Sequence, residues 1–197
     1  DKQIMSAKSV LRKQLYSIIN NLSKEEINRQ SKIVTAKVLQ NEEFKKSKVV
    51  SIYLSMPNEI QTEDILEEIF KQKKKCFIPR FQAGKPVMEM IHLESMEHYH
   101  SLPKNKWNIK QPPMEENVES IFDKGQLDLV LTPGLAFTSN GLRLGRGKGY
   151  YDQFLKKCMN ELPKLPYTIG LAFNEQILDH VPTETHDVCL DLIIAPE

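Results

Sequence analysis

A glycine-rich run at residues 141–152 holds the residues of this chain that are best suited to chemistry. It reads GLRLGRGKGYYD and contains four of the eight glycines of the chain. The alternating glycines 145, 147 and 149 permit positive φ and a close backbone approach, so that consecutive N–H groups converge on an anion. The run therefore predicts a phosphate cradle, and Asp152 at its end is a candidate to hold a cation beside the phosphates. Three side chains supply positive charge: Arg143, Arg146 and Lys148.

Two common phosphate-binding loops have a different spacing. A Walker loop requires a glycine five residues before its Gly-Lys pair and a hydroxyl after it, but Leu142 and Gly149 stand at these positions. The dinucleotide fingerprint spaces its glycines by two and three residues, whereas here the spacing is two and two. The alternatives are a flexible basic surface loop or an arginine–glycine segment that binds RNA non-specifically. Such RNA-binding segments usually recur in disordered sequence, while this run occurs once between two ordered elements.

The flanking elements place the run at a strand-to-helix junction. Residues 127–133 predict a buried strand and residues 150–158 predict a helix, whose first N–H groups would also point at the ligand. Amphipathic helices are expected at residues 2–20 and after Ser23, which forms a capping box with Glu26. A further helix, capped near Thr62, is expected to run to Phe70. Strands are expected at residues 49–54, 76–79, 168–172 and 190–194, with an edge or antiparallel strand at 88–91.

This alternation of strands and helices predicts one α/β domain over residues 1–197, with a mostly parallel sheet flanked by helices on both sides. The segment 95–125 does not fit the pattern. It contains three prolines and the only tryptophan, and unstructured stretches of this length are usually functional or disordered. Trp107 is either an aromatic wall for a planar ligand or an anchor for the loop.

Charge and composition exclude several classes of protein. The 27 basic residues nearly balance the 26 acidic ones, which argues against a general binder of nucleic acid or membrane surfaces. Three cysteines without metal-type spacing predict buried, reduced thiols, and the five histidines show no zinc pattern. No apolar run approaches the ~20 residues of a membrane span, and the first residues lack the apolar core of a signal peptide. We expect a soluble, cytoplasmic protein.

Several segments outside the glycine-rich run are also distinctive. They are KSVLR with Arg12, SIYLSMPNEI at 51–60, FIPR at 77–80, WNI at 107–109 and LTPGLAF at 131–137. Together with RLGRGKGYYD, the most specific element, these segments resemble 5-formyltetrahydrofolate cyclo-ligases, also called 5,10-methenyltetrahydrofolate synthetases. The resemblance covers about residues 7–188 and is closest to the animal cytosolic enzymes.

The resemblance implies an ATP- and Mg²⁺-dependent conversion of 5-formyltetrahydrofolate to 5,10-methenyltetrahydrofolate, with release of ADP and phosphate. It also implies a fold shared with sugar-phosphate isomerases and CoA transferases. We expect a monomer and, from the near-neutral charge, no nucleic-acid or membrane partner. Arg146 and Lys148 would be catalytic, and Asp152 and Asp187 would hold the metal. The nucleotide contacts would be Lys8, Ser9, Val10, Leu11, Arg12, Arg143, Leu144, Gly145, Arg146, Gly147, Lys148, Gly149, Tyr150 and Tyr151. The folate contacts would be Leu54, Glu59, Trp107, Arg146, Gly147, Lys148, Gly149 and Tyr150.

The implied chemistry agrees with the residues, because phosphoryl transfer needs positioning and charge neutralisation more than a side-chain nucleophile. Glu59 follows a predicted strand, at the edge where α/β sheets bind ligands, and either accepts hydrogen bonds from a pterin or is a solvated turn residue. Two other functions remain open on the residues alone. One is a phosphosugar isomerase or CoA-transferase-like enzyme on the same fold, and the other is a nucleic-acid-binding module.

Overall fold

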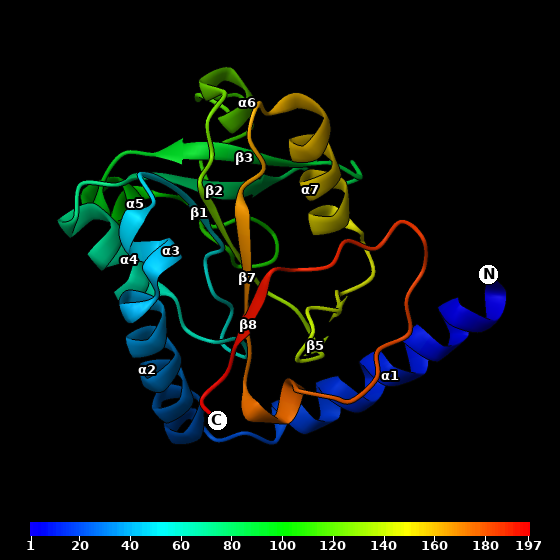
Figure 1. Ribbon diagram of the computed structural model, residues 1–197. Helices are drawn as coiled ribbons and strands as arrows, with labels where there is room; N and C mark the ends of the chain where they lie inside the picture. The colour runs from blue at the N-terminus through cyan, green and yellow to red at the C-terminus, as the bar shows by residue number, and fades with distance from the viewer.

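A six-stranded sheet lies at the centre of the computed structural model, which describes residues 1–197 (Figure 1). The strand order is β3-β2-β1-β4-β7-β8, with β3 antiparallel to β2 and all other neighbours parallel. The mostly parallel sheet and its antiparallel edge strand are thus confirmed. The strands are β1 (Val49–Ile52), β2 (Lys75–Phe81), β3 (Met88–Leu93), β4 (Leu129–Thr132), β7 (Tyr167–Leu171) and β8 (Leu192–Ile194).

The sheet separates two hydrophobic cores, because successive side chains of a strand point to opposite faces. In β4, Leu129 and Leu131 join the larger core, whereas Val130 between them joins the smaller one. In β2, Cys76 and Ile78 alternate with Phe77 in the same way. Burial on both faces explains why these strands read as continuous apolar runs in the sequence.

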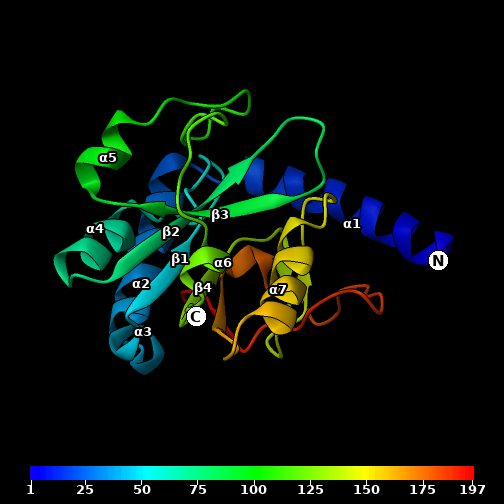
Figure 2. The same cartoon turned by 90° about the horizontal axis from the view of Figure 1, so that it is seen from above.

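Helices cover both faces, as the alternating pattern predicts. The larger core receives side chains from α1 (Lys2–Asn20), α2 (Lys24–Gln40), α3 (Glu42–Lys46) and α4 (Glu63–Lys71). The smaller core receives them from α6 (Ile121–Lys124) and α7 (Tyr150–Glu161). Figures 1 and 2 show α2, α3 and α4 on one side of the sheet and α7 on the other, while the N-terminal turns of α1 project from the body. None of these helices has both the length and the apolar content needed to cross a membrane.

Several local details go beyond the expectations or differ from them. Thr62 is the N-cap residue of α4 (Glu63–Lys71), as expected, but its side chain makes no capping hydrogen bond, because its hydroxyl donates to the Tyr53 carbonyl oxygen at 2.8 Å. Segment 95–125 contains two short helices, α5 (Met96–Ser101) and α6. Cys76 and Cys158 are buried as expected, but Cys189 is exposed because it lies on a surface loop before β8. Sequence reasoning also missed a hairpin of β5 (Ala136–Phe137) and β6 (Arg143–Leu144), and the short 3₁₀ helix η1 (Asn174–Gln176).

The sheet order reverses between β1 and β4. From β1 the chain passes to β2 and β3 on one side, and it returns to place β4, β7 and β8 on the other. In open α/β sheets, ligands bind at the carboxyl ends of the strands where the order reverses. The segments that follow β1 and β4 are therefore the first place to look for a site.

Candidate active site

A cavity of about 680 Å³ lies at this switch point, and it brings together segments from the whole length of the chain. Leu54 and Glu59 line it from the segment after β1, and Pro133 and Gly134 line it from the turn after β4. Other walls come from α1, from the glycine-rich run, from the end of β2 with the loop that carries Trp107, and from the segment that contains Glu184 and Asp187. The expected phosphate cradle therefore opens into a cavity that several distant segments of the chain line together, as expected for a ligand-binding site.

Two of the three alternating glycines have the expected conformation, and the third has a different role. Gly147 and Gly149 have φ values of 107° and 70°, in the left-handed region that favours glycine. Gly145 does not have a positive φ; instead, a Cβ at this position would lie 3.1 Å from a terminal nitrogen of Arg143. The expectation of positive φ at residue 145 is therefore wrong, and this glycine makes room for a guanidinium group.

The three cationic side chains of the run differ in their exposure and in how many protein groups they already contact, and so in how readily each can bind a ligand. Lys148 is exposed. Arg146 is half-buried, and one of its terminal nitrogens donates to the Tyr16 hydroxyl at 3.1 Å. Arg143 has only 6% of its side chain exposed; it donates to the Pro133 carbonyl oxygen at 3.0 Å and lies 3.7 Å from a carboxylate oxygen of Asp152. Its guanidinium group is thus part of the cavity wall, with its charge partly balanced by protein.

Glu59 is a buried carboxylate and not a solvated turn residue, so that alternative is wrong. One carboxylate oxygen accepts the Met56 N–H at 2.8 Å, and the other lies 3.6 Å from a terminal nitrogen of Arg146. Burial raises the pKa of Glu59 above its ordinary value, and the charge of Arg146 opposes this effect. The position at the carboxyl end of β1 is the one expected from the sequence.

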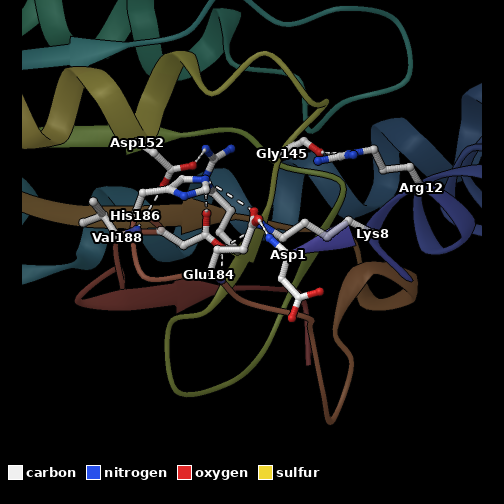
Figure 3. A network of polar contacts seen from close by, with 10 residues as sticks. Asp1, Lys8, Arg12, Gly145, Asp152, Glu184, His186 and Val188 are labelled. Carbon is white, nitrogen blue, oxygen red and sulfur yellow. Dashed lines mark hydrogen bonds and ion pairs between the residues drawn. The ribbon is translucent and has the colours of Figure 1, made fainter. Parts of the chain in front are cut away.

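Helix α1 contributes Lys8, Ser9 and Arg12 to the cavity, since residues four apart share a helix face. Arg12 Nε donates to the Gly145 carbonyl oxygen at 2.9 Å and so fastens the helix to the glycine-rich run (Figure 3). Val10 and Leu11 do not reach the cavity. Val10 is 54% exposed and Leu11 packs on the larger core, because both lie on other faces of the helix. The expected contact segment 8–12 is therefore only partly placed at the site.

An acidic cluster faces Lys8 from the segment before β8. Lys8 Nζ donates to Glu184 and to Asp187, both at 2.8 Å. Burial acts to lower the pKa of Lys8, but the hydrogen bonds and negative charges of Asp187 and Glu184 together outweigh it and leave the pKa raised. Glu184, His186 and Asp187 bring their ligand atoms within 4.8 Å of one another, and Figure 3 shows Glu184 and His186 beside Lys8. Sequence reasoning missed Glu184 and His186, because this segment has no regular pattern.

The two carboxylates that the resemblance assigns to a metal both line the cavity, but each already has protein partners. Asp152 accepts the Val188 N–H at 3.0 Å with one oxygen, and its other oxygen lies 3.7 Å from Arg143. Asp187 accepts from Lys8, and Lys8 contributes to keeping the Asp187 pKa low although burial acts to raise it. Carboxylate oxygens are the donors that Mg²⁺ prefers, so the chemistry of both residues fits this ion.

An aromatic wall closes another side of the cavity. The ring of Phe81 lies 5.0 Å from that of Tyr150 and 6.3 Å from that of Trp107, the latter at an interplanar angle of 76°. Trp107 is 43% exposed and lines the cavity, which fits a wall for a planar ligand better than a buried anchor. Phe81 was not expected at the site, although its position just after the predicted strand 76–79 is a signal that sequence reasoning had available.

Polar atoms without a partner also lie at the cavity. In the whole chain, only three buried side-chain polar atoms have no hydrogen-bond partner: Thr132 Oγ1, Arg143 Nε and the Tyr151 hydroxyl. Arg143 and Tyr151 line the cavity, and Thr132 directly precedes Pro133 in its wall. Such groups are rare in folded proteins, and their concentration here is typical of a functional site.

Comparisons with known proteins agree with one another. A model of the 5-formyltetrahydrofolate cyclo-ligase family matches residues 4–196. A mouse 5-formyltetrahydrofolate cyclo-ligase is 46% identical over 97% of this chain and 94% of its own length. A probable 5-formyltetrahydrofolate cyclo-ligase from Caenorhabditis elegans is 38% identical over 97% of this chain and 93% of its own length. Among solved structures, Aquifex aeolicus 5,10-methenyltetrahydrofolate synthetase superposes with a TM-score of 0.74 at 29% identity, covering 94% of this chain and 88% of that one.

Proposed function

The chain belongs to the 5-formyltetrahydrofolate cyclo-ligase family, and we propose which part of its cavity binds ATP and which part binds the folate. The protein is an ATP-dependent ligase that converts 5-formyltetrahydrofolate to 5,10-methenyltetrahydrofolate. The observation that carries the proposal is that one cavity holds two chemically different halves. One half is cationic and built on glycines, and the other contains a buried carboxylate and aromatic rings.

The cationic half takes the triphosphate of ATP. Lys148 and Arg146 project from the glycine-rich run, and Lys8 and Arg12 face them from α1. The N-terminus of α7 begins directly after Gly149, so its free N–H groups add to the attraction for an anion. Arg146 lies between the two halves, because it contacts Glu59 as well as Tyr16. This position suits a cation that neutralises charge on the group in transfer.

The other half takes the folate. Glu59 is placed to accept hydrogen bonds from the N–H groups of the pterin, and Leu54 and the aromatic wall provide apolar contact. Burial makes such a hydrogen bond strong, since the surrounding protein competes for it less than water does. The half-site is therefore selective for a ligand that combines a planar ring with hydrogen-bond donors.

The chemistry activates a poor electrophile. A lone pair of the formyl oxygen forms a bond to the γ-phosphorus of ATP, and the bond to the bridging oxygen breaks with its electrons leaving on ADP. Nitrogen-10 then attacks the formyl carbon and loses its proton. The carbon–oxygen bond breaks as phosphate departs, which leaves the methenyl bridge between nitrogen-5 and nitrogen-10. Arg146 and Lys148 neutralise charge during the transfer, and the cavity holds the two folate nitrogens close for ring closure.

Asp152 and Asp187 would hold Mg²⁺ when it arrives with the nucleotide. Bound there, the ion would neutralise phosphate charge and help to orient the phosphoryl group. Lys8 and Arg143 hold these carboxylates in the free protein. The binding of nucleotide must therefore exchange at least part of the Lys8 contacts for phosphate contacts.

We also propose that the protein works as a cytoplasmic monomer. All three cysteines are free thiols, as is typical of a reducing compartment. Light scattering of the purified protein tests the monomeric state, and fractionation of cells that express it tests the cytoplasmic location.

The experiment that tests the function is incubation of the protein with 5-formyltetrahydrofolate and Mg-ATP. We expect the absorbance of the methenyl product to appear together with an equal amount of ADP. Controls without ATP and with unformylated tetrahydrofolate should form no product. Consumption of ATP without the methenyl product would contradict the proposal.

A further inference from the structure

Two side-chain amides behind the aromatic wall, Gln111 and Asn105, connect its parts although neither lines the cavity. Strand β1 pairs with β2 only as far as Phe77, so Phe81 at the end of β2 has no strand neighbour on that side. Gln111 takes the place of this neighbour. Its oxygen accepts the Phe81 N–H at 3.0 Å, and its nitrogen donates to the Phe81 carbonyl oxygen at 2.9 Å. Gln111 is 6% exposed, so water does not compete for these bonds.

Asn105 forms hydrogen bonds to the backbone of the loop that carries Trp107, as Gln111 does to the backbone of Phe81. Its side-chain oxygen accepts the Trp107 N–H at 2.9 Å and the Ile109 N–H at 3.1 Å. Its backbone N–H donates to the Ile109 carbonyl oxygen at 2.8 Å, and Asn108 inside this tight turn has a φ of 63°. The turn is thus organised around one amide, and Trp107 stands at its tip.

The two amides are joined to each other. Asn105 Nδ2 donates to the side-chain oxygen of Gln111 at 2.9 Å. This bond joins the amide that holds the backbone of Phe81 to the amide that holds the backbone of Trp107. The Phe81 and Trp107 rings have their centroids 6.3 Å apart, an edge-to-face contact that depends on the relative position of the two segments.

We propose that Gln111 and Asn105 are positioning residues that fix Phe81 and Trp107 as a rigid aromatic wall for the folate. The inference rests on the proposed function, because it assumes that this wall contacts the substrate. A connected amide network with a buried member, Gln111, favours one geometry, and a wall that is already formed avoids an ordering cost when the ligand binds. The amides therefore act on folate affinity and not on the phosphoryl-transfer step.

Asn105→Asp is the sharpest test, because aspartate keeps the oxygen that accepts from Trp107 and Ile109 but loses the donor to Gln111. We expect the KM for 5-formyltetrahydrofolate to rise roughly three- to tenfold, the effect of one lost hydrogen bond. We expect kcat and the KM for ATP to stay within about twofold of their original values. Gln111→Glu, which keeps the acceptor but loses the donor to Phe81, should have an effect in the same direction.

Trp107 is the only tryptophan, so its fluorescence reports on the wall without substrate and independently of the function. In Asn105→Asp we expect the emission to shift to longer wavelength, because the ring loses its fixed contact with Phe81. Asn41→Asp is the matched control. Asn41 also accepts a backbone N–H, from Phe44 at 3.1 Å, but it caps α3 outside the cavity lining, and its replacement should change neither KM nor emission.

The results separate the possible failures. Unchanged emission and unchanged folate KM in both Asn105→Asp and Gln111→Glu would overturn the proposal. So would an equal rise in the KM values for folate and ATP, since this indicates a general loss of structure. A changed emission with an unchanged folate KM would show that the amides position the wall but that folate does not use it. Failure of the original protein to form the methenyl product would instead contradict the proposed function.

Discussion

At the scale of single residues, the three cations of the glycine-rich run have separate roles. Arg143 is a buried part of the wall, Arg146 joins the two halves of the cavity, and Lys148 is exposed and has no ion-pair partner among the acidic residues. A charge that is not yet paired is available in full to a phosphate, whereas a paired one must first exchange its partner. The contribution of each residue to stability and to turnover should differ accordingly.

Lys148→Ala should lower turnover by roughly 10²-fold or more, the usual effect of removing a preorganised charge, and leave the melting temperature unchanged. Arg146→Ala should lower turnover similarly, but it should also lower the melting temperature, because buried Glu59 loses its counter-charge. Steady-state kinetics and thermal melts of both variants measure these effects. Turnover like that of the original protein in both variants would reject the assignment of the cradle.

Glu59→Gln should weaken folate binding more than ATP binding, because it keeps the shape and loses a charged acceptor worth about 1.5–3 kcal/mol. The variant also removes a pH dependence. Burial raises the pKa of Glu59 above its ordinary value of 4.5. At pH values between 4.5, the pKa in the unfolded chain, and the raised pKa in the folded protein, the folded state binds more protons than the unfolded state. The contribution of Glu59 to the free energy of unfolding therefore falls as the pH rises through this range.

Chemical denaturation of the original protein and of Glu59→Gln across this pH range tests the predicted pH dependence of stability. The free energy of unfolding should fall less with rising pH in the variant than in the original protein.

Titration calorimetry with folate and with ATP tests the predicted difference in ligand affinity. An equal loss of affinity for folate and ATP would argue against a role of Glu59 in the folate half-site.

At the scale of elements, the sequence predicted those whose patterns are long. The α1 helix and the buried strands follow from apolar spacing, and the edge strand β3 follows from the turn before it. The β5-β6 hairpin has two residues in each strand, which is too short for a period to be recognised. Thr62 has the residue type of a helix cap, but a tertiary contact with Tyr53 takes its hydroxyl.

The candidate site was predictable where its residues follow strands or lie in the glycine-rich run. Glu59, Arg146 and Trp107 line the cavity as expected. The burial of Glu59 and the contacts of Lys8 were not predictable, because they depend on residues distant in the sequence. Lys8 and Glu184, for example, are 176 residues apart. Val10 and Leu11 were wrongly predicted to contact the nucleotide. The resemblance supplied residues 8–12 as one continuous segment, but only some residues of a helix face the same side.

At the scale of the whole molecule, the cavity closes only when α1, the glycine-rich run and residues 184–187 meet. In the free protein, Lys8 and Arg143 contact the carboxylates of Asp187 and Asp152. These protein cations compete with any metal ion for the same oxygens. A divalent ion that retains several of its waters gains little from such a site unless phosphate oxygens complete it.

We therefore expect no measurable Mg²⁺ binding to the free protein by titration calorimetry, and binding when a non-hydrolysable ATP analogue is present. Asp152→Asn should raise the Mg²⁺ concentration needed for half-maximal turnover, and Asp187→Asn should do so more weakly. Tight Mg²⁺ binding without nucleotide, or an unchanged requirement in Asp152→Asn, would mean that Asp152 only supports the backbone at Val188.

The ion pair between Lys8 and Glu184 also has a consequence for the synthesis of the chain. Ribosomes add about 5–20 residues per second, so the sequence separation of 176 residues corresponds to a delay of roughly 9–35 s between the synthesis of the two partners. During this time Lys8 has no acidic partner from the later segment, and α1 has no completed surface on which to dock. A nascent chain stalled before Glu184 should therefore leave α1 open to proteases, and the enzyme should gain its nucleotide site only near the end of translation.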